Sequence, residues 1–260
     1  MAQPRFFDTH AHLVQPYFNQ EQLEKALAFA REQGVDRIIV PSTNLDDWQQ
    51  VRQLAKSHPK LDLAFGIHPD SARPEHDRGI FKQIQKTPII ALGEIGIDLY
   101  RQTNPPLEVQ RQVFELFCDY GLKHDLPLLV HMRSAEQAVY DVLSQKKYQK
   151  LRFVIHSFTS DYEWAQKFIE LGGLISFSGI VTFKNAQNVA SVARQLPLDK
   201  IICETDTPYL TPVPLRGQSN QPAYVKHVAE FIARIRPEKA EKVIAALYEN
   251  ARRFFRKKAA

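Results

Sequence analysis

The sequence contains few of the residues and runs that disulfide-stabilised or membrane-spanning proteins require. Only 2 of its 260 residues are cysteine, and both Cys118 and Cys203 stand among apolar neighbours. This usage argues against a disulfide scaffold and predicts reduced thiols in the core of a cytoplasmic protein. No apolar run reaches the roughly 18 residues of a membrane span, and the first residues lack the apolar core of a signal peptide. We therefore expect a cytoplasmic protein that does not associate with membranes.

The excess positive charge is confined to one end of the chain. The net charge is +5, and residues 251–260 contain five basic and no acidic side chains. Basic side chains at the end of a helix complement the helix dipole without any ligand. The overall charge therefore says little about whether the protein binds nucleic acid.

What the chain does have is a regular alternation of short apolar segments and amphipathic helical patterns. The short apolar runs are typical of buried parallel strands, and the longer segments repeat apolar residues at helical spacing. Asn44 and Ser160 are placed to cap helices at their N-termini, and Gly34 to end one. The predicted strands are residues 6–12, 37–40, 61–67, 88–92, 127–130, 151–155, 174–177 and 200–203. The predicted helices are residues 20–33, 45–54, 77–86, 107–124, 136–147, 162–171, 188–196 and 223–255, the last broken at Pro237.

This alternation predicts an α/β fold with a closed barrel of parallel strands. A βα unit takes roughly 30 residues, and the predicted strands recur at intervals close to this length. Eight units imply a (β/α)8 TIM barrel that occupies residues 1–260 as one domain, with an extra helical region at about 238–258. An open doubly wound sheet is the alternative, but no glycine-rich phosphate-binding turn follows the first strand.

The first predicted strand carries two histidines that point to the same face. Residues 6–12 read Phe-Phe-Asp-Thr-His-Ala-His, so that His10 and His12 are separated by one residue. Alternate side chains of a strand share a face, and two neutral imidazoles suit Zn²⁺ or Mn²⁺. Asp8 lies on the same face and could bind the metal or orient a histidine. The alternative is a strand end with two solvated histidines, and the motif alone does not decide between them.

Further predicted strands also end in side chains that bind metal ions. Glu94, His131, His156 and Asp206 stand at or just past the ends of the fourth, fifth, sixth and eighth strands. The carboxyl ends of barrel strands converge on one face, where active sites lie. Five strands that deliver metal-binding side chains to one face favour a metal site over coincidence.

At these positions the sequence resembles the TatD-related metal-dependent deoxyribonucleases, a family within the amidohydrolase superfamily. The similar segments are residues 6–12, 93–98 (Gly-Glu-Ile-Gly-Ile-Asp), 130–133 (Val-His-Met-Arg), 154–156 (Val-Ile-His) and 202–208 (Ile-Cys-Glu-Thr-Asp-Thr-Pro). The similarity extends from about Phe6 to beyond Pro222, and the loop at 217–222 is most similar to the YjjV-like branch. Val14 departs from the Asp or Asn that members often carry, and Ser219 stands where the better-known nucleases have Arg.

The resemblance implies a centre of two divalent metal ions, Zn²⁺, Mg²⁺ or Mn²⁺. Its ligands would be His10, His12 and Asp206 for one metal, His131 and His156 for the other, and Glu94 for both. Two cations activate water and offset the negative charge that develops on a phosphodiester. Asp206 could also serve as the catalytic general base. Glu204 is either a second catalytic group, which orients water or binds a further metal, or a carboxylate that supports a metal ligand.

Three side chains near the predicted centre are candidates for substrate contacts. His68 follows the third strand, Arg133 could hold a phosphate bidentately, and Asn220 lies in the polar loop after the last strand. The alternatives are a solvated histidine for His68 and an ordinary loop ion pair for Arg133. Tyr100 follows the fourth strand, where an aromatic ring could stack on a base.

Three functions are compatible with these patterns. The first, which the resemblance implies, is a metal-dependent deoxyribonuclease of the 3′–5′ exonuclease type, with DNA as substrate and no obligate protein partner. The second is a hydrolase that acts on a small-molecule phosphoester, ester or amide. The third is a non-catalytic protein that keeps a metallated barrel. The complete ligand set with a candidate base argues against the third.

Overall fold

The computed structural model describes residues 4–256, which contain one eight-stranded parallel sheet. The strands follow one another around the sheet in chain order. Extensions of the first and last strands meet at a parallel bridge between Ala11 and Thr207, so the sheet forms a nearly closed barrel, as predicted. The strands are β1 Phe6–Asp8, β2 Val35–Pro41, β3 Leu61–Phe65, β4 Ala91–Asp98, β5 Leu128–Arg133, β6 Phe153–Ile155, β7 Leu174–Phe177 and β8 Ile201–Cys203.

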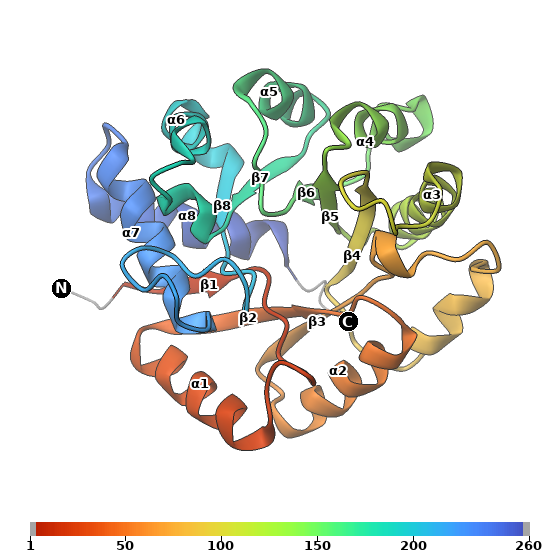
Figure 1. Cartoon of the computed structure of the whole chain (residues 1–260), viewed down its shortest axis with the longest axis horizontal. Coiled ribbons are helices and arrows are strands. Elements are labelled where there is room, and N and C mark those ends of the chain that lie inside the picture. The colour runs from red at the N-terminus through yellow and green to blue at the C-terminus, as the bar shows by residue number, and fades with distance from the viewer. Residues whose placement is uncertain (1–3, 257–260) are drawn as a thin grey trace.

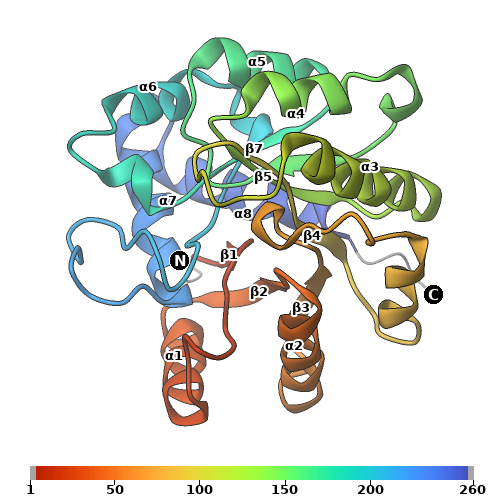
Figure 2. The same cartoon turned by 45° about the vertical axis from the view of Figure 1, so that its right-hand side comes forward.

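Helices surround the barrel (Figure 1). The α-helices are α1 Gln20–Glu32, α2 Leu45–Ser57, α3 Leu107–His124, α4 Glu136–Leu143, α5 Tyr162–Glu170, α6 Gln187–Gln195, α7 Val225–Ile235 and α8 Ala240–Phe254. Short 3₁₀ helices span Pro69–Ser71, Arg78–Ile84, Lys146–Tyr148, Gly179–Thr182, Leu198–Lys200 and Pro222–Tyr224. Figure 2 shows α1 and α2 beside each other on the side of β2 and β3. Within residues 4–256, no helix is long and apolar enough to cross a membrane.

Side-chain caps fix the starts of the first two helices. Asn19 and Gln22 form a reciprocal capping box, in which each side chain accepts a hydrogen bond from the backbone amide of the other residue. The side chain of Asn44 accepts from the amide of Asp47 at 2.8 Å and caps α2, as predicted. Such caps satisfy amides that a helix cannot pair internally.

The inside of the barrel is filled by one residue from each strand and closed by α8. These buried strand residues are Phe7, Ile39, Ala64, Ala91, Leu129, Val154, Leu174 and Ile202. Tyr248, Ala251 and Phe255, from the end of α8 and the residue after it, belong to the same cluster, and the rings of Phe7 and Phe255 lie 6.0 Å apart edge to face. This apolar packing fills the middle of the barrel, and the polar side chains of the candidate site lie beyond it, at the carboxyl ends of the strands.

Three of the predicted strands were too short and the first was too long. The predicted strand 37–40 is β2 Val35–Pro41, and the predicted strand 6–12 ends at Asp8, so that His10 and His12 follow β1. Residues 88–92 and 127–130 were expected as strands, but β4 and β5 continue to Asp98 and Arg133, so that Glu94 and His131 lie within strands. The pairing of β4 with β5 shifts between Leu92 and Ile95 and then resumes. Glycine at position 96 lets the two strands approach closely after this shift. Its φ is +141°, and an added Cβ would lie only 2.0 Å from the carbonyl oxygen of His131.

Three local predictions were also wrong. The segment 77–86 forms a 3₁₀ helix over Arg78–Ile84 instead of an α-helix, and Lys86 just after it has φ 66°, which an α-helix cannot continue through. The cap of α5 is Asp161, directly before the helix, and not Ser160. Helix α4 ends at Leu143 and is followed by a separate 3₁₀ turn. The predicted C-terminal helical region to about residue 258 is occupied by α8 up to Phe254, and residues 257–258 lie outside the described part of the chain.

Candidate metal centre

Asp8 joins β1 to the segment after β8 beneath the site. Its carboxylate accepts from the Thr205 amide at 2.8 Å and from the Thr205 hydroxyl at 2.6 Å. Burial raises the pKa of Asp8 to about 8, against hydrogen bonds that lower it. Of the two roles considered for Asp8, the structure favours positioning, because its oxygens face Thr205 and the backbone amide of His10.

The two histidines after β1 meet two carboxylates. Their Nε2 atoms lie 3.2 Å apart, and each is within 3.4 Å of Glu94 Oε2. Asp206 Oδ1 is 3.9 Å from His10 Nε2 and 3.8 Å from His12 Nε2. Ligand atoms about 2.0–2.1 Å from a tetrahedral cation are about 3.3 Å from one another. His10, His12 and Glu94 therefore form a set of the size and chemistry that a divalent cation requires, and Asp206 lies at its edge.

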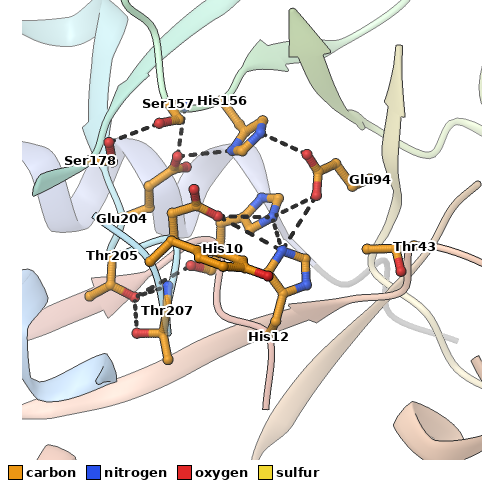
Figure 3. A network of polar contacts seen from close by, with 12 residues as sticks. His10, His12, Thr43, Glu94, His156, Ser157, Ser178, Glu204, Thr205 and Thr207 are labelled. Carbon is orange, nitrogen blue, oxygen red and sulfur yellow. Dashed lines mark hydrogen bonds and ion pairs between the residues drawn. The ribbon is translucent and has the colours of Figure 1, made fainter. Parts of the chain in front are cut away.

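The other oxygen of Glu94 faces a different pair of histidines. Glu94 Oε1 is 2.7 Å from His131 Nδ1 and 3.0 Å from His156 Nε2, and these two nitrogens are 3.5 Å apart. Figure 3 shows Glu94 with one oxygen directed to His156 and the other to His10 and His12. One carboxylate thus stands between two pairs of imidazoles.

The electrostatics of Glu94 keep it ionised despite its position. Burial alone would raise its pKa, but the surrounding imidazoles, led by His156 and His68, hold that pKa well below its ordinary value. In turn, although burial acts to lower the pKa of His12, Glu94 raises that pKa above its ordinary value. A buried carboxylate surrounded by imidazole nitrogens offers the ligand types that a divalent cation takes, and a bound cation would displace the protons that Glu94 favours on these histidines.

Asp206 is held in an uncommon backbone conformation. It has φ +58°, in the left-handed region that non-glycine residues seldom adopt, and its amide donates to the His10 carbonyl at 2.9 Å. This hydrogen bond fixes Asp206 against the histidine segment, and the side chain remains 14% exposed toward the cleft. Strain of this kind is typical of residues whose direction matters for function.

Glu204 supports a histidine more directly than it faces substrate. It is 0% exposed, and its Oε1 accepts from the Ser157 amide at 2.6 Å and lies 3.1 Å from His156 Nδ1. Ser176 donates to Oε2 at 2.6 Å. Although Glu204, His10 and His156 lie close enough to hold an ion, both oxygens of Glu204 are already occupied. The geometry favours the role of orienting His156 over the catalytic role.

Asp98 is a supporting residue to which the sequence analysis gave no role. Its Oδ2 lies 3.2 Å from His131 Nε2, on the side of the ring away from Glu94. Burial raises and the His131 hydrogen bond lowers the pKa of Asp98, with a net shift to about 2. Asp98 ends the Gly-Glu-Ile-Gly-Ile-Asp segment, four residues after Glu94, so its place on the strand face could have been inferred from strand periodicity.

A cleft of about 570 Å³ opens above these residues. His68 lines it, with Nε2 3.7 Å from Glu94 Oε1 and Nδ1 2.9 Å from Asp70. Arg133 also lines it and lies 3.9 Å over the ring of Tyr100. Both residues therefore stand where the sequence analysis expected contacts with substrate.

Asn220 does not face the cleft. It is 1% exposed, and its Nδ2 donates to the carbonyls of Thr205 and Tyr209, while its Oδ1 accepts from the Gln221 amide at 2.9 Å. The structure favours a structural role for Asn220 over the predicted contact with substrate, because its polar atoms are used to hold the chain on both sides of Asp206. The sequence did not indicate that Asn220 is buried, because it is a polar residue within a polar loop.

Comparisons with known proteins agree with this geometry. A family model described as TatD related DNase matches residues 7–256. YabD of Bacillus subtilis and YcfH of Escherichia coli, both described as metal-dependent hydrolases, are 33% and 34% identical. The alignments cover 96% of this chain and 98% of YabD, and 95% of this chain and 94% of YcfH.

The crystal structure of YjjV, a TatD homologue of Escherichia coli, is similar to the whole fold. It has a TM-score of 0.88 at 29% identity and covers 98% of this chain and 99% of YjjV. The loop at 217–222 suggested the YjjV-like branch. The identity to YjjV is comparable to the identities to YabD and YcfH. The chain belongs to the TatD-related DNase family of metal-dependent hydrolases.

Proposed function

We propose that this hydrolase cleaves phosphodiester bonds in DNA, in the manner of a 3′–5′ exonuclease, with two divalent metal ions. The observation that supports the proposal is the position of Glu94, because its two carboxylate oxygens face two different pairs of histidines. In this proposal His10, His12 and Asp206 hold one ion, His131 and His156 hold the other, and Glu94 is shared.

When bound, the pair of cations would lower the pKa of water and offset the charge of a phosphoryl group. Asp206 faces the cleft and can accept the proton of an attacking water. Glu204 and Asp98 hold the rings of His156 and His131 from behind. His68 is placed to donate a hydrogen bond to a substrate oxygen near Glu94.

Arg101 and Arg133 support an anionic substrate. Both line the cleft, and within residues 4–256 neither has a carboxylate at ion-pair distance. Unpaired guanidinium groups beside a concave site attract phosphate and can bind it bidentately. Tyr209 lines the cleft and is 48% exposed, and Tyr100, which is 62% exposed, lies against Arg133; unpaired bases could stack on either ring.

A hydrolase of a small-molecule phosphoester, ester or amide is the second candidate. The volume of the cleft, about 570 Å³, favours it, because sites for small molecules usually have volumes of about 300–1,000 Å³. The loop that carries Ser219 in place of a family Arg also offers one less cation for a polymer backbone.

A single experiment separates the two candidates. End-labelled single-stranded DNA and a panel of nitrophenyl phosphates, acyl esters and N-acyl amino acids are incubated with the protein in Mg²⁺, Mn²⁺ or Zn²⁺. We expect stepwise shortening of the labelled strand from its 3′ end. Turnover of the small-molecule panel alone would remove the nuclease proposal.

Matched variants show whether any cleavage comes from this site. Glu94→Gln should abolish cleavage, because it removes the charge of the proposed shared ligand. Glu170→Gln changes an exposed acid at the C-terminal end of α5 and should cleave as the unchanged protein does. Equal cleavage by the two variants would trace the activity to a contaminant.

A further inference from the structure

A second cavity adjoins the cleft on the side of β1, β2 and β3. This side pocket has a volume of about 440 Å³ and is lined by residues that include Gln15, Tyr17, Thr43, Gln50 and Arg73. Tyr17 and Thr43 also line the catalytic cleft, so the two cavities share a wall. Figure 3 shows Thr43 beside the histidine cluster, on the other side of it from Glu204. A substrate that extends past His12 would therefore enter the side pocket.

Tyr17 is fixed at the boundary between the two cavities. Its hydroxyl accepts a hydrogen bond of 2.6 Å from the hydroxyl of Tyr209, and the two rings meet edge to face with centroids 5.5 Å apart. The ring of Tyr17 is also 6.4 Å from that of His12 and remains 40% exposed. A held, partly exposed ring beside the metal ligands is a surface on which a planar group of the substrate can stack.

The charges of the side pocket disfavour phosphate. Asp46 and Asp47 contribute two carboxylates and Arg73 one guanidinium. The Nη1 of Arg73 donates to the backbone carbonyls of Asp70 and Ala72. An anion would thus meet a net negative lining here, whereas the main cleft offers Arg101 and Arg133.

The neutral polar groups of the side pocket suit the edge of a heterocycle. The Oε1 of Gln50 accepts from the Gln15 amide at 3.1 Å, which leaves the Nε2 of Gln50 available as a donor. Gln15, which has a second side-chain amide, also lines the pocket. Side-chain amides pair with the donor and acceptor edges of nucleobases, and unstacked bases lie on aromatic rings.

We propose that the side pocket binds a nucleobase of the substrate, stacked on Tyr17 and hydrogen-bonded through Gln50, while the adjoining phosphate lies at the metal ligands. The inference rests on the proposed function, because it assigns one part of a nucleic-acid substrate to a place next to the reacting bond. It identifies the base beside the scissile phosphate as a determinant of affinity.

The test measures equilibrium binding of the four free deoxynucleosides to the purified protein by calorimetry, so that no catalytic turnover is required. At least one deoxynucleoside should bind. Tyr17→Ala should weaken that binding by about 5-fold to 150-fold, the range expected for loss of base stacking, and Tyr17→Phe should keep it. Gln50→Leu should weaken it by roughly 2-fold to 10-fold, as expected for one hydrogen bond.

Gln49→Leu is the matched control, because Gln49 is exposed beside Gln50 on α2 and does not line the side pocket. It should bind deoxynucleosides as the unchanged protein does. If no deoxynucleoside binds, or if Tyr17→Ala and Gln50→Leu bind as tightly as Gln49→Leu, the inference is wrong. Binding with the expected pattern in a protein that cleaves no DNA would retain the side pocket and remove the proposed nuclease function. DNA cleavage without such binding would retain the proposed nuclease function and rule out the nucleobase site in the side pocket.

Discussion

Replacing Glu204 by Gln tests whether this buried acid orients a metal ligand or takes part in the chemistry. In the native protein, Glu204 is enclosed by His156 Nδ1 at 3.1 Å, the Ser157 amide at 2.6 Å and the Ser176 hydroxyl at 2.6 Å. Gln keeps the shape and one carbonyl acceptor for His156 and Ser157. It removes the negative charge, and the hydroxyl of Ser176 must turn to accept from the new amide.

The expected effect is moderate because the change acts through His156. Loss of a group that orients a metal ligand typically costs 10-fold to 100-fold in metal affinity or activity, which corresponds to about 1.4–2.7 kcal/mol. The fold should persist, since the hydrogen bonds to Ser157 and Ser176 can be kept. Ser176→Ala, which removes only one hydrogen bond to Glu204, should cause a smaller loss.

The assay combines metal affinity, measured by competition with a chromogenic chelator, with the rate of hydrolysis at saturating metal. Our reasoning predicts that Glu204→Gln weakens metal binding and that excess metal restores a large part of the activity. Unchanged metal affinity with a loss of activity beyond about 1,000-fold, well above the range for an orienting group, would refute it. Glu204 would then be a catalytic residue, as the first interpretation of the sequence allowed.

Three further predictions follow from the structure. Asn220→Ala should lower the free energy of unfolding by about 1–3 kcal/mol, because the buried carbonyl of Thr205 and the part-buried carbonyl of Tyr209 lose their side-chain donor. Denaturant unfolding measures this, and a loss of substrate affinity at unchanged stability would contradict it. Cys118 and Cys203 should not react with a thiol reagent such as Ellman's reagent until the protein unfolds, because burial raises the pKa of both thiols; rapid reaction of the folded chain would show that one of them is accessible. Removal of metal with a chelator should lower the melting temperature as well as the activity, because an ion that binds only the native state stabilises that state. Calorimetry with and without added Mn²⁺ or Zn²⁺ gives the comparison, and an unchanged melting temperature would count against a bound ion.

The order of the elements could be predicted from the sequence because the apolar segments are short, separate and regularly spaced. The range of α3, Leu107–His124, and that of β7, Leu174–Phe177, were predicted to the residue. The lengths of β4 and β5 could not be predicted, because charged and histidine residues continue strands that pair past a register shift. Local patterns did not reveal that Gly96 would allow the close approach between these two strands.

The convergence of the candidate metal ligands could also be predicted, because parallel strands in a barrel bring their carboxyl ends together. Which other polar residues face the cleft could be predicted only in part: His68 and Arg133 line it as expected. Asn220 and Glu204 are polar residues near the centre, but the fold buries both and uses their polar atoms internally. The support that Asp98 gives to His131 depends on the exact register between β4 and β5, which pairs Asp98 with Arg133 and Gly96 with His131.

The central claim is that Glu94 is shared between two metal ions at the barrel mouth. Anomalous X-ray scattering from crystals grown in Mn²⁺ or Zn²⁺, with the metal content of the same protein measured in solution, tests it most directly. The account predicts two anomalous peaks, one between Glu94 and the pair His10 and His12, and one between Glu94 and the pair His131 and His156. The absence of any peak beside Glu94 in metal-saturated crystals, or a single peak on one side of it, would contradict the account.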